Sequence, residues 1–367
     1  MNDDELTSLI ALKKTPLIGD ITAKKLITHF GSAKEVYEHK KSDIERIDGI
    51  GSAIIKHLQD PQYRIAAEKE LNFVHANKAI RLITYTDDAY PPLLKQCADA
   101  PVVLFQRGNI NLDSKRIISI VGTRNITAYG QAFCEKLIEE LAPLGVVVVS
   151  GMAYGVDITA HKAAIKHGLQ TIGCLAHGLD TFYPSAHYKY AREVEENGGF
   201  FTDFGHQSKF DRKNFLSRNR IIAGLSAATV VIESGAKGGS LVTADIAFSY
   251  NRDVFAVPGR ATDPYSIGCN HLIRSEKARI LLSAKDLIYH LNWENRPPKA
   301  VQKQLFVTLT DEEQRIADYL RMHGKQLLDS IAPACEMPIH KASHLLFQLE
   351  MKDIVRALPG KLFECIV

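Results

Sequence analysis

A basic segment at 209–220 carries the residue types best suited to binding a polyanion. Two aromatic residues, Phe210 and Phe215, lie among its cations, and cations beside aromatic faces suit phosphates and bases together. A solvated basic loop would have the same composition, so this segment alone leaves both interpretations open. The five cations are Lys209, Arg212, Lys213, Arg218 and Arg220.

A glycine-rich turn at 234–240 follows an apolar, β-branched run at 228–233 and precedes a helical pattern. The apolar run is typical of a strand that is buried on both faces. A strand, a glycine-rich turn and a helix start together present free backbone N–H groups and a positive dipole end to an anion. The alternative is a tight turn with no ligand, since a short motif is only a hypothesis.

Two further strand ends have the same character. The run at 116–122 ends at Gly122, which lets a ligand approach the backbone, and Arg124 then supplies a forked cation suited to phosphate. A surface arginine after a strand is the plain alternative. The dinucleotide fingerprint GxGxxG is absent from this turn.

The second of these strand ends, after the run at 145–151, places Gly151 and Gly155 before a helix. Ligands bind at the carboxyl ends of strands in open α/β sheets, so this turn is a candidate site. We expect Asp157 to cap the helix rather than act as a catalytic acid, and His161 to be a packed side chain. Tyr183, in the turn after the third strand, could stack a base or pack on the sheet.

No catalytic constellation accompanies these turns in the sequence. We find no Ser/His/Asp arrangement, no P-loop lysine motif and no metal-spaced His/Glu pair. The sequence therefore predicts a site that binds rather than catalyses, without a metal or a cofactor. Glu233, at the end of the strand at 228–233, could be an acid, but we expect it to orient an arginine or backbone groups.

The composition is that of an ordinary globular protein. The chain has 367 residues, a net charge of +3 and 46% hydrophobic residues, so a nucleic-acid site must come from local clustering of charge. The six cysteines form no CxxC pair, which indicates reduced thiols in a cytoplasmic protein. The acidic amino terminus is not a signal peptide, and no apolar stretch is long enough to span a membrane.

The pattern along the chain predicts an α/β fold with a doubly wound, mostly parallel, Rossmann-like sheet at 66–291, because continuous apolar strands alternate there with amphipathic helices. Residues 1–65 are expected to form a helical domain of the helix-hairpin-helix or SAM-like kind. A polar, proline-containing linker at 292–304 leads to a domain at 305–367 with winged-helix-like character, three helices and a β-ribbon.

Five sequence blocks in this order resemble the DNA-processing protein A family, also called DprA or Smf. The blocks are VGTR at 121–124, SGMAYGVDITAHKAA at 150–164, GLDTFYP at 178–184, the stretch from SRNRIIAGLS to VFAVPG at 217–259, and GCNHLIRSEKA at 268–278. Thr123 stands where the family more usually has Ser, and His187 where it usually has Asn.

The resemblance implies an extended Rossmann-like domain that binds single-stranded DNA. Arg124 would grip phosphate, the turns at 151–155 and 238–240 would line the pocket floor, and the cations Lys189, Arg218 and Arg220 would extend the groove. The DNA-binding residues that the resemblance implies are Gly122, Thr123, Arg124, Ser150, Gly151, Gly155, Lys189, Arg218, Asn219, Arg220, Lys237, Gly238, Gly239, Ser240 and Thr243.

The function that the resemblance implies is that of a non-enzymatic recombination mediator. Such a protein protects incoming DNA, loads the RecA recombinase during natural transformation and forms a homodimer. The alternative is a nucleotide-processing or nucleotide-sensing protein of the lysine-decarboxylase-like group. The enzymes of that group have PGGxGT with a nearby glutamate, whereas this chain has AKGGSLVTA, with Glu233 at the end of the preceding strand. The two hypotheses differ in whether a longer oligonucleotide binds more tightly.

Overall fold

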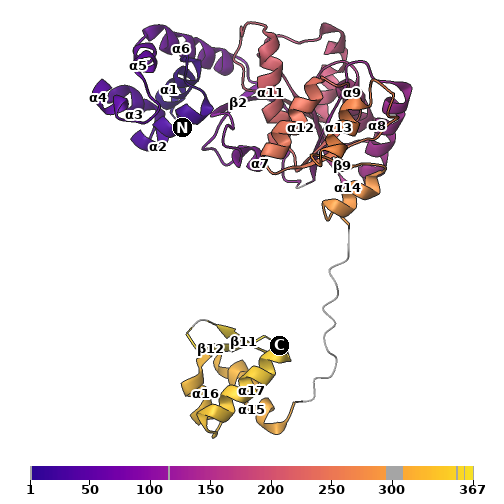
Figure 1. The fold of residues 1–367 in the computed structure, drawn as a ribbon. Helices are drawn as coiled ribbons and strands as arrows, with labels where there is room; N and C mark the ends of the chain where they lie inside the picture. The colour runs from indigo at the N-terminus through magenta and orange to yellow at the C-terminus, as the bar shows by residue number, and fades with distance from the viewer. Residues whose placement is uncertain (1, 115, 295–308, 353, 359, 367) are drawn as a thin grey trace. The chain divides into compact units, whose positions relative to one another are not determined.

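The structure is a computed structural model, and it describes every residue except 1, 115, 295–308, 353, 359 and 367. The chain divides into two compact units, Met1–Glu294 and Asn295–Val367 (Figure 1). The predicted linker at 292–304 lies outside the described residues from 295 onward. Trp293, near the end of the first unit, is buried against the core of that unit.

A nine-stranded sheet organises the first unit, in the order β1-β2-β6-β5-β4-β3-β7-β8-β9. The strands from β3 to β9 run parallel, whereas β1 and β2 form an antiparallel edge that joins β6. The predicted mostly parallel sheet is confirmed. The strands are β1 Ile80–Thr84, β2 Val103–Gly108, β3 Ile117–Val121, β4 Val147–Ser150, β5 Thr171–Cys174, β6 Gly198–Thr202, β7 Ala228–Val231, β8 Asp253–Ala256 and β9 Arg279–Ile280.

Helices cover both faces of the sheet, as a doubly wound fold requires. In β3, Ile118 and Ile120 pack toward α8, α9 and α14, whereas Ile117 and Val121 pack toward α7, α11, α12 and α13. Every side chain of β3 is buried, which explains its unbroken apolar sequence. The helices are α7 Pro92–Lys95, α8 Ala128–Leu141, α9 Val156–Lys166, α10 Ala191–Glu196, α11 Arg212–Leu225, α12 Gly239–Ser249, α13 Ile267–Arg274 and α14 Ala284–His290, with 3-10 turns η1 Ala142–Leu144 and η2 Ser185–Tyr190.

The strand order reverses direction at β3, which lies between β4 and β7. The chain proceeds outward from β3 through β4, β5 and β6 on one side, and through β7, β8 and β9 on the other. The loops after β3 and β7 therefore diverge, which leaves a crevice outside their carboxyl ends. Open α/β sheets bind ligands at such a switch point.

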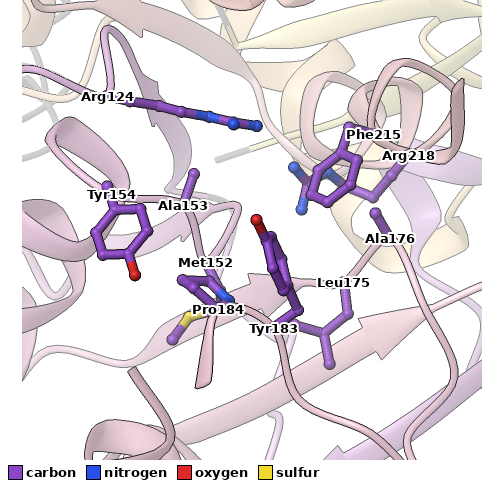
Figure 2. A pocket seen from close by; sticks show the side chains of 10 residues that line it. All are labelled: Arg124, Met152, Ala153, Tyr154, Leu175, Ala176, Tyr183, Pro184, Phe215 and Arg218. Atoms are coloured by element: carbon purple, nitrogen blue, oxygen red, sulfur yellow. The ribbon is translucent and has the colours of Figure 1, made fainter. Parts of the chain in front are cut away.

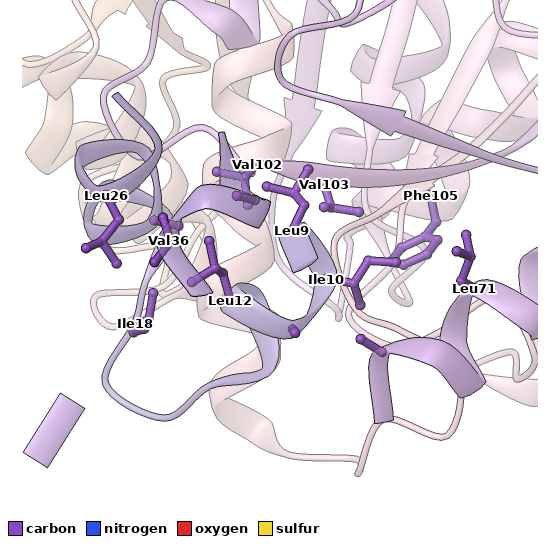
Figure 3. Close-up of a cluster of buried hydrophobic side chains, with 14 of the residues drawn as sticks. Leu9, Ile10, Leu12, Ile18, Leu26, Val36, Leu71, Val102, Val103 and Phe105 are labelled. Carbon is purple, nitrogen blue, oxygen red and sulfur yellow. The ribbon is translucent and has the colours of Figure 1, made fainter. Parts of the chain in front are cut away.

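Six helices precede the sheet and pack on its antiparallel edge. Figure 3 shows Leu9 and Ile10 of the first helix beside Val103 and Phe105 of β2. This shared apolar core explains why residues 1–76 belong to the same compact unit as the sheet. The helix-hairpin-helix or SAM-like character of this part stays a prediction. The helices are α1 Asp3–Lys14, α2 Asp20–Phe30, α3 Ala33–Glu38, α4 Lys41–Glu45, α5 Ser52–Leu58 and α6 Pro61–Ala76.

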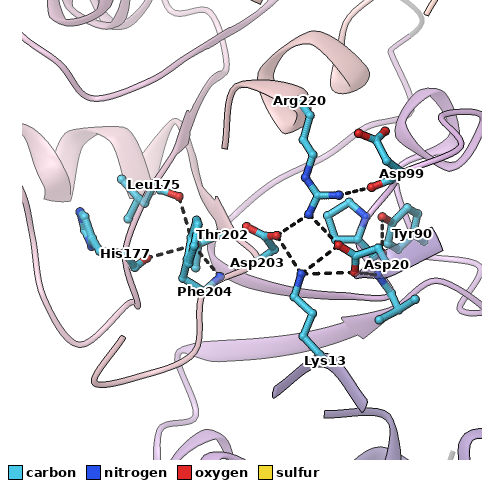
Figure 4. Close-up of polar contacts among 12 residues, drawn as sticks. Lys13, Asp20, Tyr90, Asp99, Leu175, His177, Thr202, Asp203, Phe204 and Arg220 are labelled. Atoms are coloured by element: carbon cyan, nitrogen blue, oxygen red, sulfur yellow. Dashed lines mark hydrogen bonds and ion pairs between the residues drawn. The ribbon is translucent and has the colours of Figure 1, made fainter. Parts of the chain in front are cut away.

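A buried ion-pair network joins these helices to the sheet and to α11 (Figure 4). The Arg220 guanidinium lies 2.8 Å from the Asp20 carboxylate and 2.6 Å from that of Asp203, and Lys13 Nζ lies 3.0 Å from each of the same two carboxylates. Burial would raise the pKa of Asp203, but the Lys13 and Arg220 cations hold that pKa below its ordinary value. Two cations and two carboxylates thus compensate one another.

In its described residues, the second unit has three helices and a three-stranded sheet in the order β10-β12-β11. Thr310 caps the first of these described helices and forms a capping box with Glu313. The winged-helix-like description stays a prediction. The elements are α15 Asp311–His323, β10 Gln326–Leu327, α16 Leu328–Ala334, α17 Ile339–Met351, β11 Val355–Leu358 and β12 Leu362–Cys365. Among the described helices of both units, none has the length and apolar character needed to cross a membrane.

His161 on α9 is a fully buried core histidine, as expected. Its Nε2 lies 2.6 Å from the Gly151 carbonyl oxygen and its Nδ1 lies 2.7 Å from Thr171 Oγ1. Burial lowers the pKa of His161 to about 4, because a buried imidazolium loses its hydration. The side chain therefore ties α9 to β4 and β5 in its neutral form.

We predict that replacing Arg220 by Met lowers the free energy of unfolding by about 3–5 kcal/mol, because Asp20 and Asp203 would remain buried with only Lys13 opposite them. Urea unfolding followed by the fluorescence of Trp293, the single tryptophan, measures this loss. Arg192→Met is the matched control, because its pair with Glu196 is exposed and should leave the midpoint unchanged. Equal midpoints for the two variants would contradict the prediction.

We predict that stability declines as the pH falls from 6.5 toward 4, because the unfolded chain binds a proton at His161 that the folded chain does not bind. The neutral histidine contributes its full stabilisation above pH 6.5, about 3 kcal/mol for a shift of this size. Urea midpoints of the wild type and His161→Asn at several pH values check this. A variant that loses stability with pH as steeply as the wild type would refute the role of His161.

Candidate nucleic-acid interface

A cleft of about 710 Å³ lies at the switch point of the sheet. Its floor comes from the turn after β3, with Gly122 and Thr123, and from the turn after β7, with Gly238 and Gly239. Its wall comes from the basic segment and α11, which stand over these turns. The three regions that the sequence indicated separately are therefore brought together by the strand order.

Arg218 of α11 is a buried cation in the wall of this cleft. Its side chain donates a hydrogen bond to the Cys174 carbonyl oxygen and a longer one, 3.4 Å, to Asn219 Oδ1. Burial lowers the pKa of Arg218, and the Asp157 carboxylate opposes that shift without cancelling it. A buried arginine whose charge is incompletely compensated is suited to bind an anion.

Arg124 faces the same space from the turn after β3. Figure 2 shows the Arg124 and Arg218 side chains extending toward one another above Tyr183. The two guanidinium carbons lie 5.6 and 6.0 Å from the centre of the Phe215 ring, so both cations contact one aromatic residue. Arg124 is exposed, which leaves its forked donors available to a phosphate.

Three aromatic rings form an edge-to-face cluster along the wall. The ring centre of Tyr183 lies 4.8 Å from that of Phe210 and 5.9 Å from that of Phe215, and the two phenylalanines are 5.4 Å apart. Phe210 is 56% exposed and Tyr183 is 44% exposed, although aromatic side chains are usually covered. Exposed rings beside cations can stack nucleobases.

The turn after β4 and the start of α9 also line the cleft, at Ala153 and Asp157. Asp157 lies in the first turn of α9, where its Oδ2 accepts a 3.3 Å hydrogen bond from Ala153 N–H, and Gly155 occupies the cap position. The expectation that Asp157 caps the helix is therefore wrong by two positions. Burial raises the pKa of Asp157, and the nearby Arg218 cation opposes that change.

Glu233 orients a backbone group, which is one of the two roles expected from the sequence. Its carboxylate accepts hydrogen bonds from the Thr127 N–H at 2.9 Å and from Thr127 Oγ1 at 2.5 Å, and only 2% of the residue is exposed. A β-carbon at Gly130 would overlap this carboxylate. Glu233 thus fixes the start of α8 and does not line the cleft.

Most residues implied by the family resemblance line the cleft. Those that do are Gly122, Thr123, Arg124, Arg218, Asn219, Gly238, Gly239, Ser240 and Thr243. Lys237 is exposed in the same turn as Gly238 but is not part of the lining.

Besides Lys237, five of the implied residues do not line the cleft. Ser150 is buried and donates to the Ile120 carbonyl oxygen at 2.6 Å, while Gly151 and Gly155 lie beneath the lining residues. The exposed Lys189 has its Nζ over the Tyr190 ring, 5.0 Å from the ring centre. Arg220 pairs with the buried carboxylates of the ion-pair network. Residues two apart on a helix point to different sides, so Arg218 faces the cleft while Arg220 does not.

The sequence-based site residues omitted the aromatic wall and Arg212. The signal was present, because Phe210 and Phe215 interleave with cations, and Tyr183 was considered as a base-stacking residue. What the sequence did not reveal is that the turn after β5 meets the basic segment. In the part of the chain that the structure describes, no group of three His, Cys, Asp or Glu side chains could hold a metal ion.

Comparisons with known proteins point to one family. The sequence profile described as DNA recombination-mediator protein A matches residues 81–292. The DNA processing protein DprA of Streptococcus pneumoniae is 39% identical over 202 residues, which cover 55% of this chain and 71% of that protein. The DprA of Bacillus subtilis is 39% identical over 222 residues, which cover 60% and 74%.

Solved structures agree with the sequence comparisons. The crystal structure of DprA from S. pneumoniae has a TM-score of 0.64 at 32% identity and covers 79% of this chain and 98% of that one. A Helicobacter pylori DNA processing protein A, described for its single-stranded DNA binding mode, has a TM-score of 0.53 at 28% identity, with 58% and 96% covered. Since the matched region is the sheet whose strand ends form the cleft, the chain belongs to the DNA recombination-mediator protein A family, in agreement with the resemblance seen in its sequence blocks.

Proposed function

We propose that this chain binds single-stranded DNA in the cleft and acts as a recombination mediator without catalytic activity. In this role it protects incoming strands in the cytoplasm and loads RecA during natural transformation. The S. pneumoniae and B. subtilis relatives are DNA processing proteins, and the H. pylori relative binds single-stranded DNA. We infer that this chain shares these properties of its relatives.

The observation that carries the proposal is the pairing of cations with aromatic rings in one cleft, two of which, Tyr183 and Phe210, are exposed. Arg124 and Arg218 supply charge for phosphates, while Tyr183, Phe210 and Phe215 supply faces for bases. A mononucleotide would use one phosphate contact and one stacked ring. A strand can use several at once, so its affinity should increase with length.

The shape and lining of the cleft favour single strands over duplex. In a duplex the bases are stacked on one another, so their faces are not available to Tyr183 or Phe210. An unpaired strand can splay its bases against these rings while its phosphates meet Arg124. We therefore expect duplex DNA to compete weakly.

A nucleotide-processing function is the second candidate, because the cleft is large enough for a nucleotide. It would need an acid or base near the ligand. Glu233, the acid discussed in the sequence analysis, is hydrogen-bonded to Thr127 outside the cleft lining. Asp157 does line the cleft, but it is only 7% exposed and its carboxylate accepts a hydrogen bond from the Ala153 N–H. These placements favour binding over hydrolysis.

We also propose that the protein is a homodimer that pairs at the β9 edge of the sheet. Among the described strands, β9 pairs with β8 alone, so its other edge is open. Ile280, Leu282 and Tyr289 expose 47%, 63% and 64% of their surfaces on and beside this strand. A second copy would cover the apolar side chains and protect the open edge.

We predict that Arg124→Ala weakens binding to labelled oligo-dT and reduces the slope of log affinity against log salt by about 0.7, the value for one lost phosphate contact on a single strand. Fluorescence anisotropy over a salt series, with duplex and mononucleotide competitors, measures both quantities. Lys189→Ala is the matched control, since it removes one exposed positive charge outside the cleft. Equal losses in both variants, or complete competition by the mononucleotide, would overturn the proposal.

We predict that Leu282→Arg converts a dimer to a monomer, because it places a charge in the apolar patch beside β9. Light scattering coupled to size-exclusion chromatography gives the mass. Ile65→Arg on α6 is the control, because Ile65 is 50% exposed and distant from this edge in the sheet order. A wild type that is monomeric at high concentration would show that the dimer proposal is wrong.

A further inference from the structure

We propose that the amino-terminal helices position the aromatic wall of the cleft by holding the segment 203–208, and that Glu70 is the central positioning residue. This inference rests on the proposed function, because the wall matters only if bases stack on it. The segment 203–208 connects the end of β6 to Phe210 and to α11. Whatever fixes this segment therefore fixes where Phe210 lies.

Glu70 of α6 grips the middle of the segment. Its Oε1 accepts a 2.8 Å hydrogen bond from the His206 N–H, and its Oε2 lies 3.1 Å from His206 Nδ1 and 2.9 Å from Lys14 Nζ. Only 1% of Glu70 is exposed, although glutamate is rarely buried unless it is paired. The contact thus joins α1, α6 and the segment in one buried group.

Two neighbouring features show that the backbone is fitted around this carboxylate. A β-carbon at Gly205 would overlap the Glu70 carboxylate, so a larger residue there would displace the carboxylate from its present position. The Phe73 ring, one helical turn after Glu70, stacks on the His206 ring at 4.4 Å with an angle of 6° between their planes. The helix therefore holds the segment by charge, by hydrogen bonding and by stacking.

The start of the segment is held by a second, separate contact. Asp203 directly follows β6 and pairs with Lys13 of α1 and Arg220 of α11 (Figure 4). The same carboxylate therefore connects the amino-terminal helices to the helix that carries Arg218. Asp20 of α2 reinforces the connection, because its carboxylate pairs with the same two cations.

Local hydrogen bonds transmit the position of the segment to Phe210. The Gln207 N–H donates to Asp180 Oδ2 at 3.0 Å, and the Ser208 N–H donates to the Gly205 carbonyl oxygen at 3.3 Å. Asn214 Nδ2 then donates to the Lys209 carbonyl oxygen at 3.1 Å. Without the Glu70 contact, the segment would be held only near Asp203 and by these local hydrogen bonds. Phe210 lies just beyond the segment, so its position would become less well fixed.

The test combines Glu70→Ala with Phe210→Ala in a double-mutant cycle for oligo-dT binding by the full chain. If Glu70 acts through Phe210, each single variant weakens binding by about fivefold, the size of one lost stacking contact, and the double variant is no weaker than Phe210→Ala. Glu70→Ala combined with Arg124→Ala should instead multiply the separate losses. Glu68→Ala is the matched control, because Glu68 is exposed on the same helix.

Amide hydrogen exchange supplies a readout that does not depend on DNA. Glu70→Ala should accelerate exchange at 204–210 and leave the strands β3, β4 and β7 protected, which also shows that the variant is folded. Unchanged exchange in this segment would overturn the inference, as would multiplied losses in the Glu70/Phe210 cycle. A wild type that fails to bind oligo-dT would instead refute the proposed function.

Discussion

The cleft depends on how closely the backbone turns approach one another at the carboxyl ends of β3 and β4. A β-carbon at Gly122 would lie 2.9 Å from the Glu233 carbonyl oxygen and would also overlap Val156, and one at Gly155 would overlap the backbone of Thr123 and Arg124. Gly155 also has a φ of 75°, a conformation that other residues adopt only with strain. Glycine at these positions lets the turns nest, and this nesting lets Arg124 and Arg218 face one cleft.

The same close approach places Gly151 and Asp157 next to Arg218. Gly151 and Asp157 lie directly beneath Arg218, since a β-carbon at Gly151 would come within 2.5 Å of the Asp157 carboxylate and within 2.8 Å of the guanidinium. The Gly151 carbonyl oxygen is in turn hydrogen-bonded to His161 Nε2. The sequence block at 150–164 therefore packs closely against Arg218, and its residues Ala153 and Asp157 also line the cleft.

The fold was largely predictable because its signal is local: each strand between 116 and 258 is an apolar run, and each turn after it contains small residues. The cleft was predictable at Arg124 and Gly238 for the same reason. The role of Arg220 was not, because Lys13, Asp20 and Asp203 are far from it in sequence and only the fold brings them together. The aromatic wall likewise depends on a contact between Tyr183 and Phe210 that no spacing reveals.

The burial of Arg218 has a consequence for which side chains this position can accept. A lysine would carry the same formal charge. A buried ammonium group readily loses its proton, however, because apolar surroundings lower its pKa by several units. A guanidinium stays protonated at neutral pH even when it is covered, and its planar shape also lets it contact the Cys174 carbonyl oxygen and the Phe215 ring at once. An arginine at this position therefore keeps a positive charge in the cleft wall at any pH near neutrality, which a lysine buried in the same place would not do.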